Sequence, residues 1–128
     1  MSNIKLFQAD CLEAMDNLIS QNITVDAIIT DPPYGTVKGA NLDGWKGKAT
    51  EWDTIIPFDE LNVKFNKLLK EKGVLILFGQ EPYSSSLIQN ADKNIPFSYR
   101  CIWLKDHFAN PLTAKKAPVN YFEDINIF

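Results

Sequence analysis

Hydrophobic positions along the chain switch between the spacing of a helix and the continuous runs of buried strands. After Asp10, whose side chain can cap free backbone N–H groups, apolar residues recur at helical spacing. A mostly β-branched run at residues 25–30 then stops at two prolines, which cannot continue a strand ladder. A second helical stripe from residue 58 leads to Gly73 and to an entirely apolar run at residues 74–78, which is typical of a parallel strand covered on both faces.

Strands and helices are therefore predicted to alternate, which indicates an α/β sheet with parallel central strands. The last two strands are separated by about 18 residues, a length that is uncommon in compact domains. The expected elements are a strand at 4–7, a helix after Asp10, a strand at 25–30, a loop at 35–57, a helix capped by Asp59 and ending at Gly73, a strand at 74–78, a helix at 82–90, and strands at 97–104 and 123–128.

Composition limits the classes of protein. The 128 residues correspond to one small domain, and 45% hydrophobic residues suffice for a core. Thirteen basic against sixteen acidic residues give a net charge of −3, so any DNA-binding surface must be local or come from a partner. The single histidine excludes a multi-histidine metal site, and we expect no metal. No apolar run approaches the roughly 20 residues that span a membrane, so we expect a cytoplasmic protein.

The two cysteines carry no expected chemistry. They are too few for a disulfide framework or a metal cluster. Cys11 falls in a predicted first helical turn and Cys101 in a predicted strand, and we expect both to be small buried apolar residues. We also expect the aromatic rings of Trp52, Trp103 and Phe108 to serve in core or loop packing.

The residues that follow the strand at 25–30 carry the candidate chemistry. In open α/β sheets ligands bind beyond the carboxyl ends of the strands, where Asp31, Pro32, Pro33 and Tyr34 lie. Asp31 is a carboxylate acceptor, and the two prolines have no N–H, so carbonyl oxygens are presented without a competing donor. Tyr34 offers an aromatic face. Together these groups suit a planar ring that bears an –NH2 group, although the same tetrapeptide could be only a stiffened turn.

An exocyclic base amine is a poor nucleophile because its lone pair is delocalised into the ring. Two acceptors that bind its hydrogens favour the pyramidal form and stabilise the positive charge that develops during attack on a methyl sulfonium. The base must first leave the duplex, at a cost of a few kcal/mol, and stacking on Tyr34 could return roughly 1–3 kcal/mol.

Around this motif the sequence resembles the bacterial and phage DNA methyltransferases that modify exocyclic amino groups, in the circular permutation where the catalytic motif precedes the cofactor motif. The match at residues 25–35 is the most specific one, and the resemblance runs along nearly all of the chain. The weaker matches are residues 7–13, Trp52 with Asp53, residues 73–79, Trp103 with Lys105, and residues 123–125. Asn120 and Phe122 stand where the family often has Arg and His.

The resemblance implies a Rossmann-like, S-adenosylmethionine-dependent methyltransferase fold, with a mostly parallel sheet and an antiparallel terminal strand. Asp31 and the Pro32 carbonyl would hold the target amine, and Tyr34 would stack on the flipped base. Asp10 would contact the adenine amine of S-adenosylmethionine, unless it is only a helix cap, and Asp31 would also face the cofactor. An aspartate at the first motif position favours adenine in DNA as the target, as in restriction–modification enzymes. We thus expect residues 1–128 to be the catalytic, target-base part of such a domain.

The family's Phe-x-Gly-x-Gly cofactor motif is missing, and the chain has no Gly-x-Gly. The expected fold is therefore incomplete, and three hypotheses stay open. The chain is the catalytic part of an enzyme, with a separate C-terminal half or a homo-oligomer completing it; or it is a truncated, inactive remnant, for example of a prophage; or it acts on a cytosine amine, on RNA bases or on glutamine side chains.

Overall fold

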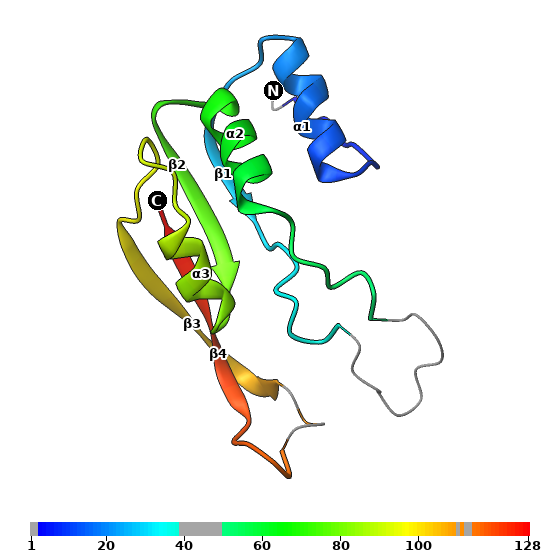
Figure 1. Cartoon of the computed structure of the whole chain (residues 1–128), viewed down its shortest axis with the longest axis vertical. Coiled ribbons are helices and arrows are strands. Elements are labelled where there is room, and N and C mark those ends of the chain that lie inside the picture. The colour runs from blue at the N-terminus through cyan, green and yellow to red at the C-terminus, as the bar shows by residue number, and fades with distance from the viewer. Residues whose placement is uncertain (1–2, 39–49, 110, 112–113) are drawn as a thin grey trace.

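The computed structural model describes residues 3–38, 50–109, 111 and 114–128. The loop expected at 35–57 includes residues 39–49, which lie outside the described residues. Helices and strands alternate as the sequence predicts (Figure 1). In chain order the elements are α1 (Cys11–Ser20), β1 (Val25–Thr30), α2 (Phe58–Leu68), β2 (Leu69–Gly79), α3 (Tyr83–Gln89), β3 (Tyr99–Ala109) and β4 (Asn120–Ile127).

The four strands form one mixed sheet in the order β1-β2-β4-β3. β1 and β2 pair in parallel, whereas β4 runs antiparallel to both of its neighbours. Three strands thus point in one direction, and the last strand of the chain points in the other. This confirms the expected α/β fold with a mostly parallel sheet, and it adds that the antiparallel strand lies inside the sheet. β1 and β3 are its two edges in the described part of the chain.

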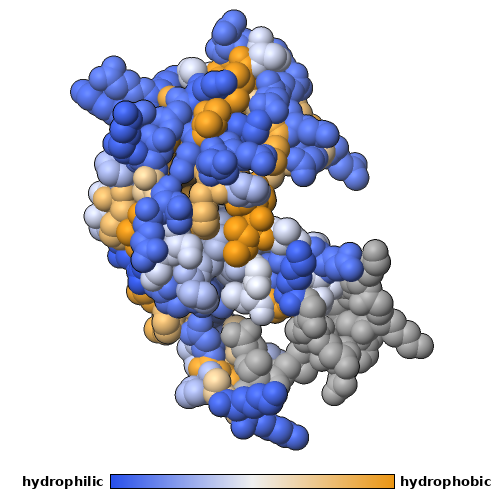
Figure 2. Space-filling model, in the orientation of Figure 1, coloured by the Kyte–Doolittle hydropathy of each residue, from blue (hydrophilic) through white to orange (hydrophobic). Residues whose placement is uncertain are grey.

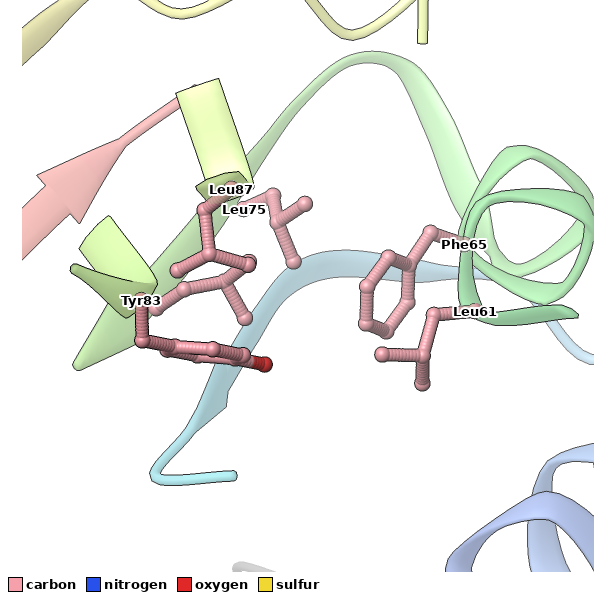
Figure 3. Packing of buried hydrophobic residues seen from close by; sticks show 6 residues of the cluster. Leu61, Phe65, Leu75, Tyr83 and Leu87 are labelled. Atoms are coloured by element: carbon pink, nitrogen blue, oxygen red, sulfur yellow. The ribbon is translucent and has the colours of Figure 1, made fainter. Parts of the chain in front are cut away.

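The hydrophobic core lies on the sheet face that α2 and α3 cover. Leu75 and Leu77 of β2 point to this face and meet side chains from both helices. Figure 3 shows Leu61 and Phe65 of α2 approaching from one side and Tyr83 and Leu87 of α3 from the other. The buried cluster consists of Leu61, Phe65, Leu75, Leu77, Tyr83 and Leu87. The core therefore fixes α3, and with it Tyr83, against the carboxyl end of β2.

Beneath α3 the sheet carries a buried polar cluster. The Ser84 hydroxyl donates to Asp124 Oδ2 at 2.6 Å, and Asn126 Nδ2 donates to the Leu77 carbonyl at 3.3 Å. Gly79 makes this close approach possible, since a Cβ there would lie 2.6 Å from Ser84 Oγ. Because buried polar groups are costly unless they are paired, these hydrogen bonds favour one position of α3 on the sheet.

The opposite sheet face, here called the outer sheet face, is apolar and largely open. Successive side chains on a strand point to opposite sides. The residues of β2 that alternate with Leu75 and Leu77 therefore belong to this face, together with their pairing partners in β1 and β4. Ile29, Val74, Tyr99 and Trp103 on it are between 39% and 65% exposed. The outer sheet face consists of Ile29, Val74, Ile76, Phe78, Tyr99, Cys101, Trp103, Ile125 and Ile127.

Several boundaries differ from the sequence-based expectation. Residues 4–7 form no strand, and their apolar side chains are exposed, because they pair with no other strand in the described chain. Asp59 does not cap α2, which begins after Pro57 without a side-chain cap. α2 also ends at Leu68 rather than at Gly73, because Leu69 is already extended and pairs with Val25 of β1.

At the other end of the chain, β3 and β4 extend into the expected long loop. β3 continues to Ala109 and β4 begins at Asn120, because the two strands form an antiparallel ladder that pairs these residues. The expectation of buried cysteines is wrong. Cys101 lies on the outer sheet face and Cys11 in the first turn of α1, and both are exposed.

Candidate functional site

The Asp-Pro-Pro-Tyr segment lies at the carboxyl end of β1, where the prolines end the strand as predicted. Pro32 is buried, Asp31 is exposed, and Tyr34 is half-buried. The segment thus has a rigid, buried backbone and presents its polar side chains at the surface.

The side chains of Asp31 and Tyr34 contact each other directly. The Tyr34 hydroxyl donates a hydrogen bond to Asp31 Oδ1 at 2.5 Å. Burial of the ring, followed by this bond and by the negative charge of Asp31, raises the pKa of Tyr34 far above its ordinary value. The phenol therefore stays protonated and acts as a donor throughout the neutral range. The sequence predicted only a stacking role for Tyr34, so this bond is an addition.

Tyr83 of α3 supports the ring of Tyr34 from one side. The two rings stack with centroids 5.4 Å apart at 30°, and Phe58 packs on Tyr83 with centroids 5.8 Å apart. Tyr83 is buried, its hydroxyl has no hydrogen-bond partner in the described structure, and burial raises its pKa to about 12. Sequence reasoning missed Tyr83, because its contact with Tyr34 depends on how α3 packs on the sheet.

Asp31 and Tyr34 open onto a hollow of about 270 Å³, here called the base hollow. Its lining residues are Asp31, Pro32, Pro33, Tyr34 and Trp52. Four of the five were predicted from the motif, and the structure brings them together. Trp52 is 64% exposed, so the expectation that it serves in packing is wrong.

Asp53 joins the segment after Tyr34 to the segment that carries Trp52. Its carboxylate is buried and accepts hydrogen bonds from the backbone N–H groups of Gly35 at 2.9 Å and Val37 at 2.7 Å. Gly35 adopts a φ of +72°, a left-handed conformation that favours glycine, and a Cβ there would lie 2.9 Å from Ile55. Asp53 and Gly35 thus determine how Trp52 is placed relative to Tyr34.

A second, apolar cavity of about 370 Å³ borders the motif and shares Asp31, Pro32 and Pro33 with the base hollow. Figure 2 shows hydrophobic side chains at the hollowed side of the molecule near α1. The remaining lining residues are Cys11, Ala14, Met15, Leu18, Ile28, Thr30, Ile56, Leu61, Phe65 and Leu77. The motif therefore separates two spaces that both reach Asp31.

Asp10 is the N-cap of α1, and its carboxylate accepts from the Leu12 N–H at 2.8 Å. Its neighbour Cys11 lines the apolar cavity, while Asp10 itself does not. The helix-cap interpretation is confirmed, and a contact with a cofactor stays a prediction.

Glu123 of β4 and Lys105 of β3 form an ion pair at the end of the sheet where β1 and β2 have their carboxyl ends. The Lys105 ammonium also lies 5.1 Å from the centre of the Trp103 ring. The charge of Glu123 contributes to the raised pKa of Tyr34, which indicates that this pair is near the motif. The described residues hold no group of three or more His, Cys, Asp or Glu side chains that could bind a metal ion. Nor does any helix in the described ranges have the length and apolarity to cross a membrane.

No protein-family model and no curated protein matches the chain. Among solved structures, the fold matches the crystal structure of M1.HpyAVI, an adenine DNA methyltransferase, with a TM-score of 0.64 and 19% identity. That match covers 94% of this chain and 52% of the other. The M1.HpyAVI–SAM complex matches with a TM-score of 0.61 and 20% identity, over 94% and 53% of the two chains.

The chain thus spans about half the length of both solved structures. At this level of identity the likeness concerns the fold. It confirms the expected incomplete Rossmann-like fold, of the kind seen in M1.HpyAVI, whose structure is also known with S-adenosylmethionine (SAM) bound.

Proposed function

We propose that this chain is the target-base half of a DNA adenine methyltransferase, which transfers the methyl group of SAM to the exocyclic amine of adenine in DNA. The observation that carries the proposal is the base hollow, where a carboxylate, a proline-rich backbone and an aromatic ring meet at the end of β1. The fold of M1.HpyAVI, an adenine DNA methyltransferase, supports this assignment.

In this proposal Asp31 and the Pro32 carbonyl accept the two hydrogens of the target amine. Asp31 Oδ1 already accepts from Tyr34, which leaves Oδ2 for the amine. Pro33 has no N–H that could compete for the Pro32 carbonyl. Both acceptors gain strength as positive charge develops on the nitrogen, so they stabilise the transition state more than the ground state. Tyr34, supported by Tyr83, holds the ring of the base in position.

The apolar cavity is the proposed cofactor side of the motif. SAM supplies an electrophilic methyl group on a sulfonium when it is bound. The cavity fits such a molecule in its chemistry, since its lining is mostly apolar and Asp31 stands at the boundary with the base hollow. Asp31 would face the positive sulfonium side, and Asp10, one residue from the cavity lining, would accept from the adenine amine of the cofactor.

A second half, either a separate polypeptide or a further part of the same one, is the proposed partner. β1 pairs only with β2 in the described part of the chain, and parallel strands are normally buried on both faces. The outer sheet face and the free edge of β1 are therefore surfaces that another layer can cover. The absence of any Gly-x-Gly segment supports a cofactor cradle that is supplied from elsewhere.

Substitution of Asp31 tests the catalytic assignment. In the complete gene product that contains these residues, Asp31→Ala should lower methyl transfer to adenine in DNA by about 100-fold or more, as for the loss of an oxyanion-type contact. The matched control is Asp26→Ala, because Asp26 is an exposed carboxylate on β1, the strand that leads to Asp31, and its side chain pairs with Lys70. An unchanged rate in Asp31→Ala removes Asp31 from the mechanism.

Calorimetric titration with SAM separates the enzyme from the alternative of an inactive remnant. Binding by the chain, or by the chain together with a second half, supports the enzyme. If neither preparation binds SAM and neither methylates DNA, the chain is a remnant. Methylation of cytosine in DNA, or of RNA, in place of adenine in DNA would show that the proposed substrate is wrong. The proposed role of Asp31 as an acceptor for the target amine would remain.

A further inference from the structure

Trp52 is the residue of the base hollow that the mechanism above does not use. It is 64% exposed, although an indole normally buries most of its surface. In the described residues no ring stacks on it and no cation lies over it, whereas the half-exposed Trp103 packs edge-on against Phe78 and lies near Lys105. An unpaired aromatic face thus points to the space that Asp31 and Tyr34 also line.

The position of Trp52 is fixed by its neighbour. Asp53 is 2% exposed, and its two carboxylate oxygens accept from the N–H groups of Gly35 and Val37, the residues that follow the motif. A buried carboxylate that accepts two backbone bonds is expensive to move. The backbone that carries Trp52 is therefore held to the segment that follows Tyr34, even though the Trp52 side chain is exposed.

In the described part of the chain, one face of the Tyr34 ring is covered and the other is left for a ligand. Tyr83 occupies the covered face, and Phe58 packs behind Tyr83. A planar base that enters the base hollow therefore lies on the free face of Tyr34, and the other aromatic residue that lines the base hollow is Trp52.

We propose that Trp52 is the second stacking surface of the base hollow, so that an extrahelical adenine lies between the rings of Tyr34 and Trp52. This inference rests on the proposed function, which supplies the base. Trp52 closes the hollow opposite Tyr34, excludes water from the amine at Asp31, and favours a purine, whose larger ring system gives more stacking area. Its exposure in the free chain follows, because its partner is the ligand.

The test measures binding of a single-stranded thymidine oligonucleotide that carries one 2-aminopurine, whose fluorescence is quenched by stacking. Trp52→Ala should weaken binding by about 5- to 100-fold, corresponding to the loss of one base-stacking contact. Trp52→Phe should remain within about threefold of the wild type, because a flat ring is kept. Trp103→Phe is the matched control, a half-exposed tryptophan that does not line the base hollow. Thermal melting of Trp52→Ala should equal that of the wild type, which excludes unfolding as the cause of weaker binding.

The outcomes separate the two proposals. Binding that is lost in Tyr34→Ala and unchanged in Trp52→Ala overturns the role of Trp52 and leaves the proposed function standing. Binding that depends on Trp52, without methyl transfer by the complete gene product, supports the second stacking surface and overturns the proposed function. If the complete gene product does not bind the oligonucleotide at all, the stacking role of Trp52 is wrong.

Discussion

The Tyr34 hydroxyl and the Asp31 carboxylate, three residues apart in the lining of the base hollow, are joined by a 2.5 Å hydrogen bond. The carboxylate is thereby oriented before any substrate arrives. In the proposed mechanism, Tyr34 therefore has two roles: its ring stacks on the base, and its hydroxyl orients the carboxylate that accepts from the amine.

Tyr34→Phe should separate these two functions. Because it removes one hydrogen bond and keeps the ring packed on Tyr83, we expect it to lower the free energy of unfolding by about 0.5–1.5 kcal/mol. Tyr34→Ala also loses the ring contact and should cost more. Urea denaturation of both variants measures the difference. Equal losses in the two variants would show that the hydroxyl bond, and not the packing of the ring, dominates.

Tyr83 should make the stability of the fold sensitive to alkaline pH. Burial raises its pKa from an ordinary value of 10.0 to about 12, so the folded state keeps the phenol protonated while the unfolded chain begins to release this proton. The resulting stability is complete below pH 10 and is lost as the pH rises from about 10 to 12. Denaturation across this range should show the loss, and Tyr83→Phe should reduce it. An unchanged alkaline slope in Tyr83→Phe contradicts the assignment.

Asp53→Ala should release the segment after the motif. The substitution leaves the N–H groups of Gly35 and Val37 without their acceptor, so we expect their amide hydrogen exchange to accelerate by about tenfold or more. Exchange in β2 should stay as in the wild type, and Asp26→Ala serves as the exposed-carboxylate control. Slow exchange at both amides in Asp53→Ala would mean that something else holds this segment.

The outer sheet face should promote association of the isolated chain, since an exposed apolar strand edge and face are sites for pairing with another chain. Ile29, which is 65% exposed, belongs to this face and lies on the edge strand β1. Ile29→Lys should therefore reduce self-association in sedimentation experiments. The control is Leu6→Lys, because Leu6 is 92% exposed but lies outside the sheet. Equal behaviour of the two variants would exclude the outer sheet face as the site of association.

Local sequence was sufficient for the position of the motif. The prolines at 32 and 33 end β1 wherever the strand lies, and the alternation of elements puts that end at the ligand-binding edge of an α/β sheet. The helix cap at Asp10 also depends on neighbouring residues alone, and it was predicted correctly.

Tertiary structure decided the features that depend on distant partners. β2 begins at Leu69 because Val25 pairs with it, which ends α2 five residues before the glycine that local rules favour. The cysteines are exposed because the faces that carry them are uncovered in this chain.

At the site, the sequence determined the chemistry of the acceptors, and the fold determined which aromatic rings surround them. Tyr83 reaches Tyr34 through the packing of α3, and Trp52 reaches the base hollow through the bonds of Asp53 to the backbone beyond the motif. Neither contact has a local signal, because each joins residues that are far apart in the chain and close only once the sheet and its loops are assembled.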